Sequence, residues 1–267
     1  MCARRCARCW ARMADFVLRA NLPVRAECVI IGAKYAHLLA QPLKKWGIKP
    51  VFVPDNPNID VRLSGHADLS ILHAGGEKLW LSPYLQESEL AARLAEYGAA
   101  LHYADIAQSA EYPHDAQLNI AALGSVFIYN PKVSYAPAVE HLTGTQKMLG
   151  VAVRQGYARC SVLAVDERSI VTQDAGIARA ARNAGLDVLV ISAGHVALDG
   201  FEYGFLGGAG FKLTADTMAF TGLLDMHPEK PRILAFLTER GINTVYLTDL
   251  PVFDIGSAIP ITEKKLL

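Results

Sequence analysis

The sequence predicts an α/β fold, a five-bladed β/α propeller in which ββαβ units close into one ring. Three observations support this prediction. A strand, a turn and a helix recur along the chain, with the turn residues 43 to 50 positions apart. A β-hairpin precedes four of the five helices. The last apolar segment, 252–261, has no helix after it and can supply the leading strand that the first unit lacks.

Five segments combine an apolar strand with an amphipathic helix: 29–47, 79–98, 127–144, 170–185 and 219–241. The turn between strand and helix falls at Gly32, Ser82, Asn130, Gln173 and Thr221. Each helix is predicted to end on a glycine, which adopts the left-handed conformation without a Cβ clash. These residues are Gly47, Gly98, Gly144, Gly185 and Gly241. A further apolar strand follows each of them.

Hairpins precede the second to fifth helices, with predicted turns at Gly75-Gly76, Gly124, Asp166-Glu167 and Ala215-Asp216. The first unit has no such hairpin. Pairing it with the closing strand at 252–261 removes the unpaired sheet edges that an open array would expose. The alternative is a doubly wound Rossmann-type sheet. It needs a glycine-rich loop after the first strand, and segment 30–38 holds one glycine.

The composition predicts one folded domain over residues 24–267. Of the 267 residues, 52% are apolar and 19% charged, so the chain can bury a substantial core. Its formal net charge is zero, which argues against a nucleic-acid partner or a membrane-surface role. No apolar stretch approaches the roughly 20 residues that span a bilayer, and we expect no membrane partner. The sequence leaves the oligomeric state open.

The cysteines indicate a reducing location. There are five, an odd number, and three crowd into the first nine residues, unlike a disulfide framework. We therefore expect a cytoplasmic protein. Cys2, Cys6 and Cys9 have a spacing that can hold an iron–sulfur cluster, so an iron–sulfur or zinc site is one hypothesis. The alternative that we adopt makes residues 1–23 a flexible N-terminal extension, in which Met13 could itself be the natural start.

Four strings resemble a known superfamily: HADLSIL (66–72), QGYARCSVLAVDE (155–167), GHVALDGFEYGFLGG (194–208) and DIGSAIP (254–260). They look like an uncharacterised bacterial family of the pentein superfamily. Penteins are five-bladed β/α propellers that include arginine and agmatine deiminases, dimethylarginine hydrolase, amidinotransferases and the non-catalytic ribosome anti-association initiation factor. The resemblance covers about residues 24–261 and implies a site at the ring's central axis.

The resemblance also implies which catalytic residues to seek. Catalytic penteins attack a guanidinium carbon with a cysteine thiolate, use a histidine as acid and base, and hold the nitrogens with carboxylates. Their cysteine lies on the ring-closing strand, which places it at Gly256 or Ser257 here. Their histidine opens the fourth blade, near Gln155. The chain lacks both usual residues at these positions.

Cys160 is the remaining candidate nucleophile. It lies in the predicted leading strand of the fourth blade, where such strands begin at the axis, and Arg159 beside it could lower the thiol pKa. A buried, inert thiol is the alternative reading. Histidines could act as its base and carboxylates could orient that base or bind a cation: His66, His114, His195, Asp68, Asp199 and Asp254. We assign catalytic roles to Cys160, His66 and Asp68.

Six further residues are predicted to bind the ligand. The glycines among them allow close backbone approach and leave N–H groups free, whereas the others offer polar side chains. They are Asn119, His195, Gly207, Gly208, Asp254 and Ser257. No metal and no other cofactor is predicted, because the histidines form no H-x-H or H-x-x-H cluster.

Two functions follow from these residues. In the first, the axial pocket binds a small polar ligand with a guanidino, amidino or amine group. The sequence leaves open whether the ligand is turned over; if it is, the protein is a Cys160-dependent hydrolase or transferase acting on C–N bonds of amidines. In the alternative, the protein is a non-catalytic macromolecule-binding module similar to the ribosome anti-association factor.

Overall fold

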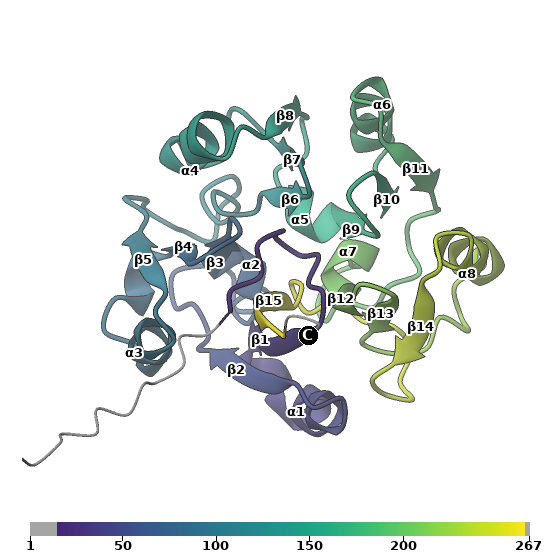
Figure 1. The fold of residues 1–267 in the computed structure, drawn as a ribbon, viewed down its shortest axis with the longest axis horizontal. Coiled ribbons are helices and arrows are strands. Elements are labelled where there is room, and N and C mark those ends of the chain that lie inside the picture. Colours follow the sequence, from purple (N-terminus) through teal and green to yellow (C-terminus); the bar gives the residue numbers. More distant parts are fainter. Residues whose placement is uncertain (1–14, 265–267) are drawn as a thin grey trace, which may run out of the picture.

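A computed structural model describes residues 15–264. The fold is mixed α/β, with five sheets of three strands each. Figure 1 shows these sheets arranged around a common centre, with the longer helices on the outside. The sheets are separate from one another, so the described residues form no single sheet that closes on itself. The predictions for residues 1–14, including the cysteine site at Cys2, Cys6 and Cys9, lie outside the described residues.

The first sheet joins the two ends of the chain. Its order is β15-β1-β2, with β1 (Ala26–Gly32), β2 (Lys49–Val53) and β15 (Ile259–Glu263). The C-terminal strand β15 runs antiparallel to β1, as the sequence predicts. The predicted strand at 252–261 begins too early, however. Gly256 and Ser257 have φ angles of 65° and 63°, and these left-handed residues interrupt an extended strand before Ile259.

The other four sheets repeat one plan. A leading strand pairs antiparallel with a middle strand, which pairs parallel with a third strand beyond the helix. The sheets are β3 (Ile71–His73), β4 (Lys78–Leu81) and β5 (Ala100–Tyr103); β6 (Ala121–Leu123), β7 (Val126–Tyr129) and β8 (Leu149–Ala152); β9 (Val162–Ala164), β10 (Ser169–Thr172) and β11 (Asp187–Val190); and β12 (Gly210–Thr214), β13 (Thr217–Phe220) and β14 (Asn243–Tyr246). The four predicted hairpins are thereby confirmed.

One longer helix follows the middle strand of each unit. These helices are α1 (Ala36–Lys45), α3 (Glu89–Glu96), α4 (Ala136–Glu140), α6 (Ala175–Asn183) and α8 (Lys230–Thr238), with 3-10 turns η1 (Ala33–Tyr35) and η2 (Pro83–Leu85). Four of the predicted glycine ends have positive φ, but Gly144 does not. There the helix widens into a π-helical turn, η3 (His141–Thr145), and Lys147 takes the left-handed position with a φ of 57°.

Three short helices lie near the centre, where the sequence predicts strands: α2 (Ala67–Ser70), α5 (Ala158–Ser161) and α7 (Leu206–Ala209). Figure 1 shows them inside the circle of sheets. Each is a single turn that leads directly into β3, β9 or β12. A turn can satisfy backbone groups internally where no neighbouring strand is within reach, as with the hydrogen bond from Ser161 N to Tyr157 O. Cys160 is therefore helical rather than extended.

Residues 15–23 pack onto the domain, although the sequence assigns them to a flexible extension. Phe16 forms an isolated bridge with Thr262 of β15. Val17 is completely buried, and its N–H donates to Ile261 O at 3.0 Å. Asn21 Nδ2 donates to Ala122 O at 2.9 Å, on a different sheet. The segment crosses the centre in Figure 1, so it covers one end of the axis.

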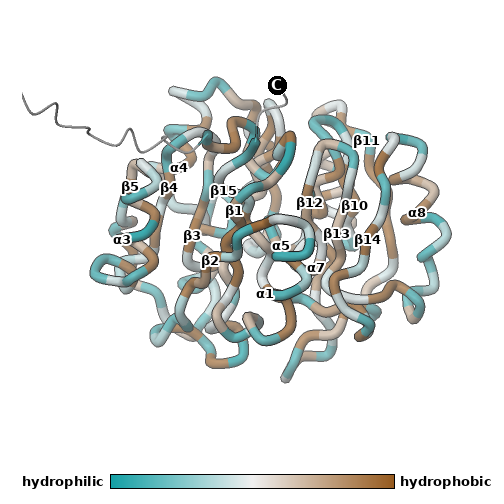
Figure 2. Tube along the Cα trace, turned by 60° about the horizontal axis from the view of Figure 1, so that its bottom comes forward, coloured by the Kyte–Doolittle hydropathy of each residue, from teal (hydrophilic) through white to brown (hydrophobic). Residues whose placement is uncertain are grey.

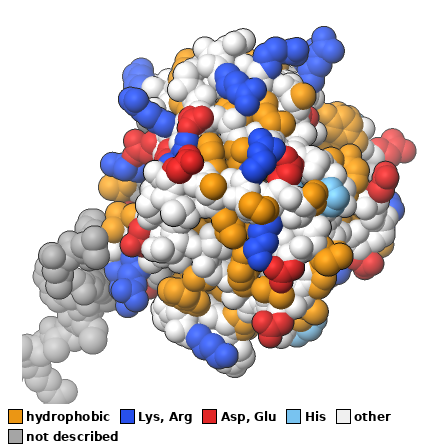
Figure 3. Space-filling model, turned by 90° about the vertical axis from the view of Figure 1, so that its right-hand side faces the viewer, with side chains coloured by type: hydrophobic (Ala, Val, Ile, Leu, Met, Phe, Trp, Pro, Cys, Tyr) orange, Lys and Arg blue, Asp and Glu red, His pale blue; other side chains and the backbone are white. Residues whose placement is uncertain are grey.

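The hydrophobic core lies between neighbouring units. Ile30 of β1, Leu79 of β4 and Leu94 of α3 are fully buried members of one cluster, so an outer helix joins two sheets. Figure 2 shows hydrophobic stretches running along the strands. Figure 3, which faces the side bearing α8 and β14, shows acidic and basic side chains interspersed on that surface. None of the helices that the structure describes has the length and apolar character needed to cross a bilayer.

Candidate functional site

Cys160 and Asp68 meet at the centre of the molecule. Cys160 lies on α5 and Asp68 on α2, two single turns that end where β9 and β3 begin. The thiol donates a hydrogen bond to Asp68 Oδ2 at a Sγ to oxygen distance of 3.0 Å. Both residues are buried, at 3% and 1% exposure. The leading segments of two different units thus deliver a nucleophilic and an acidic group to one point.

Ser257 and Asn119 complete this contact. Ser257 Oγ donates to the same oxygen, Asp68 Oδ2, at 2.8 Å. Asn119 Nδ2 donates to Cys160 Sγ at 3.3 Å, while its Oδ1 accepts from the N–H groups of Arg159 and Cys160. Asn119 therefore orients the turn that carries the thiol. The structure brings together four residues that the sequence proposes for the site.

Close backbone packing at the site requires glycine at three positions. A Cβ on Gly208 would lie 1.9 Å from Asp254 Oδ1, and one on Gly207 would lie 2.5 Å from Cys160 O. Gly256 has a φ of 65°, and a Cβ there would meet His66 Cβ at 2.2 Å. The carbonyl of Gly208 accepts from the N–H of Ser257 at 3.0 Å. These glycines let α7 and the segment before β15 approach α2 and α5 closely.

Burial controls the protonation of the thiol and of Asp68. Burial raises the pKa of the Cys160 thiol well above its usual value, and the carboxyl groups of Asp68 and Asp254 raise it further. Burial also raises the pKa of Asp68. Arg159 interacts electrostatically with Cys160, as the sequence suggests, but burial and the two acids outweigh it and the net shift of the thiol pKa is upward. The Nη1 of Arg159 donates to Val162 O at 3.4 Å and Gly207 O at 3.3 Å.

His66 adds a buried polar group without a partner. It precedes α2, is 2% exposed, and its Nε2 has no hydrogen-bond partner. Burial lowers the pKa of His66 to about 4, so the ring is neutral near pH 7. A ring nitrogen of His66, a carboxylate oxygen of Asp68 and Cys160 Sγ lie within 4.8 Å of one another. This donor set could hold a metal ion such as Zn²⁺.

Asp254 is the second buried acid of the site. Its Oδ2 accepts from Phe205 N and its Oδ1 from Gly256 N, both at 2.8 Å. Burial raises the pKa of Asp254 to about 6, so the carboxyl group is mostly ionised at neutral pH. Asp254 precedes β15 in the segment where the resemblance places the penteins' cysteine. The sequence assigns it to the closing strand, whereas the structure has a loop here.

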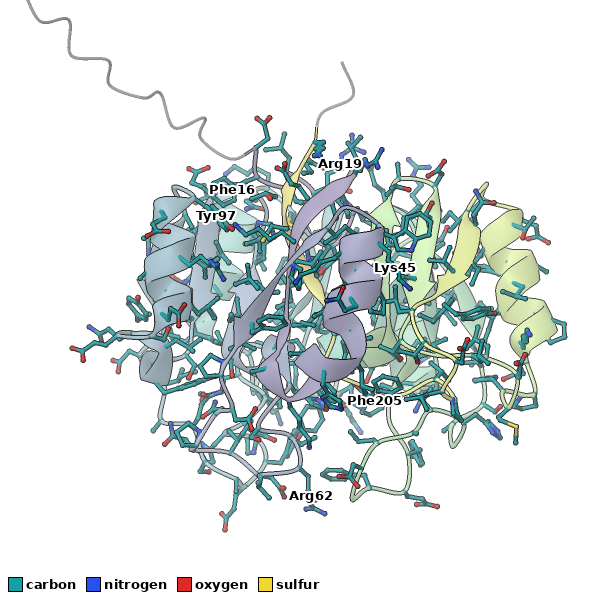
Figure 4. The ribbon with its side chains drawn as sticks, turned by 90° about the horizontal axis from the view of Figure 1, so that it is seen from below. Phe16, Arg19, Lys45, Arg62, Tyr97 and Phe205 are labelled. Atoms are coloured by element: carbon teal, nitrogen blue, oxygen red, sulfur yellow. The ribbon has the colours of Figure 1, made fainter. Side chains whose placement is uncertain are left out.

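His66, Cys160 and Asp254 together line one cavity of about 440 Å³. Its other lining residues are mostly apolar or aromatic: Leu63, Leu69, Tyr112, Gln155, Tyr157, Leu198, Phe201, Tyr203 and Phe205. Figure 4 labels Phe205 at the opposite end of the molecule from Phe16 and Arg19. The N-terminal segment therefore covers one end of the centre and the cavity opens toward the other.

Several candidate histidines and acids lie elsewhere. His195, His114 and Asp199 are exposed, and none of them lines the cavity. His195 instead contacts the ring of His227, with 5.2 Å between ring centroids. The aromatic lining residues were not among the predicted site residues, although segment 201–205 holds three aromatic residues in five. This local concentration of aromatic residues was the sequence feature that could have indicated the cavity wall.

One family model matches most of the chain. The model of a family of unknown function (DUF6873) matches residues 30–259. No curated protein matches the sequence. The family match includes all four residues of the central cluster, from Asp68 to Ser257.

Solved structures with pentein folds match most of the chain at low sequence identity. The inosamine-phosphate amidinotransferase from Streptomyces griseus has a TM-score of 0.59 and 11% identity, and covers 94% of this chain and 98% of its own. The C. jejuni agmatine deiminase has a TM-score of 0.55 and 10% identity, covering 93% and 97%. DDAH from Pseudomonas aeruginosa has a TM-score of 0.51 and 9% identity, covering 88% and 96%. The resemblance to the pentein superfamily is thereby confirmed at the level of fold. The ribosome-factor alternative gains no support from these matches.

Proposed function

The chain belongs to the family of unknown function (DUF6873), and we propose that it binds a small cation with an amidino, guanidino or amine group in the cavity floored by His66, Cys160 and Asp254. The observation that carries this proposal is the composition of that cavity. An ionisable acid, a histidine with an unpartnered Nε2 and a thiol lie together at the floor of an otherwise largely apolar space. The planar N–H groups of an amidinium or guanidinium ion can donate hydrogen bonds to the carboxylate and to the histidine nitrogen.

The charge of the floor favours a monovalent cation. Asp68 and Asp254 are buried acids, and Arg159, 5% exposed, is the buried base that interacts with both of them. His66 and Cys160 are neutral near pH 7 because of their shifted pKa values. When both acids are ionised, the cluster has one more negative than positive charge. A buried charge without a partner of opposite sign costs free energy. A bound monovalent cation would balance the excess negative charge.

We further propose that Cys160 attacks the amidine carbon of the bound ligand. An Sγ–C bond would form as the thiol proton moves along the 3.0 Å hydrogen bond to Asp68 Oδ2. The C–N bond then breaks, and the same proton goes to the leaving amine. Water or an acceptor amine would next release the carbon from sulfur, which gives a hydrolase or a transferase. The bound cation favours thiolate formation because it offsets the nearby carboxylates.

The names of similar structures are consistent with this chemistry. An amidinotransferase and an agmatine deiminase are among the proteins with the same fold. We propose accordingly that the five sheets are the blades of a closed propeller, with the ligand at its axis. A Cys-dependent reaction needs a reduced thiol, so we propose a cytoplasmic location. The resemblance to a bacterial family is the basis for proposing a bacterial source. Cys160 and Cys28, the cysteines that the structure describes, are both free.

The test combines binding with turnover. Benzamidine binding is measured by calorimetry, and methylamine release from N-methylbenzamidine is measured by mass spectrometry. We expect Asp254→Asn to weaken binding, and Cys160→Ala to keep binding but abolish release. The exposed Asp199→Asn serves as the matched control for Asp254→Asn. Absence of benzamidine binding to the wild-type protein would overturn the proposal, and binding without release would overturn its catalytic part.

A further inference from the structure

The cavity beside His66, Cys160 and Asp254, which we call its floor, is lined by aromatic side chains that we call the aromatic wall. Tyr112, Tyr157, Phe201, Tyr203 and Phe205 all line it. Their rings come from three separate stretches of chain, and the rings of Tyr112 and Tyr157 lie next to each other, with 5.6 Å between centroids. At about 440 Å³ the cavity is much larger than an amidinium group needs. The space beyond the three floor residues is large enough to accommodate another part of the ligand.

Part of this wall is held in place by an arginine outside the cavity. Arg62 stacks over the Phe201 ring, with 4.3 Å from Cζ to the ring centroid. Its Nη1 donates to Gly200 O at 2.9 Å, and its Nε donates to Asp60 Oδ1 at 2.9 Å. Figure 4 shows Arg62 at the same end of the molecule as Phe205. The guanidinium is thus engaged by its own neighbours and fixes the loop at 200–201.

No lysine or arginine lines this cavity among residues 15–264. Arg159 lies beneath the floor, where it is bound to backbone carbonyls. Lys34, which interacts electrostatically with His66, directs its Nζ toward Arg62 O at 3.4 Å. Gln155 is also engaged, because its Nε2 donates to Asp174 Oδ2 at 3.4 Å. A carboxylate on the ligand would therefore meet aromatic rings and no counter-ion.

We propose that the ligand is an amidine or guanidine with an apolar, preferably aromatic, arm and without a carboxylate. This inference rests on the proposed function and specifies its substrate class. The cationic head lies against Asp254 and His66, and the arm packs against the aromatic wall. Amino-acid guanidines such as arginine are disfavoured because their carboxylate would lose hydration without gaining a counter-ion.

The experiment compares three amidines by calorimetry on the full chain: acetamidine, benzamidine and 4-amidinobenzoate. Benzamidine should bind at least about tenfold more tightly than acetamidine, because its ring buries apolar surface against the wall. The added carboxylate of 4-amidinobenzoate should weaken binding by at least about tenfold relative to benzamidine. Equal or tighter binding of 4-amidinobenzoate would overturn the inference and leave the proposed function standing. If no amidine binds, the proposed function fails as well.

A substitution designed to increase the affinity for the carboxylate-bearing ligand provides a second test. Tyr203 is 36% exposed at the mouth, so a longer polar side chain can be tolerated there. Tyr203→Arg should supply the missing counter-ion and improve 4-amidinobenzoate binding by about tenfold relative to benzamidine. Tyr203→Gln removes the same ring without adding a charge and should not change the preference for benzamidine. Leu149→Arg, at an exposed position on β8, controls for net charge. An unchanged preference in a folded Tyr203→Arg protein would contradict the proposed position of the carboxylate.

Discussion

Cys160 Sγ donates a hydrogen bond to Asp68 Oδ2 at 3.0 Å, although 92 residues separate the two in sequence. Burial and two nearby acids keep the thiol protonated, and the same arrangement gives its proton an acceptor within direct reach. This pair differs from the nucleophile and histidine that the pentein resemblance implies. The chemistry of the site therefore has to be argued from these side chains and not from the fold.

Asp68→Asn is predicted to lower the pKa of the Cys160 thiol. The carboxylate raises that pKa because negative charge disfavours a thiolate, and asparagine removes the charge while keeping an acceptor oxygen. The rate of iodoacetamide alkylation at Cys160, followed by peptide mass spectrometry, should rise at a lower pH in the variant. Cys28 is the internal control, since burial raises its pKa to about 12 and it lies outside the cluster. An alkylation profile at Cys160 that does not move would argue against the Asp68 contact.

Ligand binding should weaken on acidification. The pKa of Asp254 is raised from 3.8 to about 6, so this acid is mostly ionised above pH 6 and loses its charge below it. The affinity for benzamidine should be constant between pH 7 and pH 8. It should fall by up to about tenfold per pH unit below pH 6, because a cation binds the ionised form. Calorimetry from pH 5 to pH 8 measures this, and Asp254→Asn should give a weak, flat profile. A flat wild-type profile would show that another group holds the cation.

Gly208→Ala should disrupt the site. Its Cβ would lie 1.9 Å from Asp254 Oδ1, so the carboxyl group or α7 must move. We expect a loss of about 1–3 kcal/mol in the free energy of unfolding and a loss of benzamidine binding. Gly144→Ala is the matched control, because a Cβ there meets nothing within 4 Å. Chemical denaturation and calorimetry check both variants, and a Gly208→Ala protein with normal affinity would be inconsistent with this packing.

Val17→Ala tests the packing of the N-terminal segment. Val17 is completely buried, whereas the adjacent Leu18 is 69% exposed. Removal of two buried carbon atoms should reduce the free energy of unfolding by about 1–2 kcal/mol. Leu18→Ala should change it by less than about 0.5 kcal/mol. Urea denaturation distinguishes these outcomes, and equal effects of the two substitutions would mean that the segment does not belong to the domain.

Much of the fold could be predicted from local patterns. The strands beside Gly75, Gly76 and Gly124 and the helices ending at Gly47 and Gly98 carry turn and capping signals within a few residues. The single turns α2, α5 and α7 carry none, because four residues are too few to show a helical period. The packing of Val17 depends on contacts with distant strands, which the sequence of 15–23 does not reveal.

The site was only partly predictable, because it too depends on contacts between residues that are far apart in the sequence. Cys160, Asp68 and Ser257 were chosen by residue type and position in the repeat, but their mutual contact depends on three different units. His195 shows why residue type alone is insufficient. A histidine could serve in such a site, but this one is exposed and lies outside the cavity. The aromatic wall was missed because its rings come from separate loops. Only the folded chain shows that they line one cavity.

A crystal structure of the protein with bound benzamidine tests the central claim most directly. The account predicts the amidinium group within hydrogen-bonding distance of Asp254, close to Cys160 Sγ, and the phenyl ring among Tyr157, Phe201 and Phe205. Benzamidine bound at another surface, or an empty cavity at saturating concentration, would contradict it.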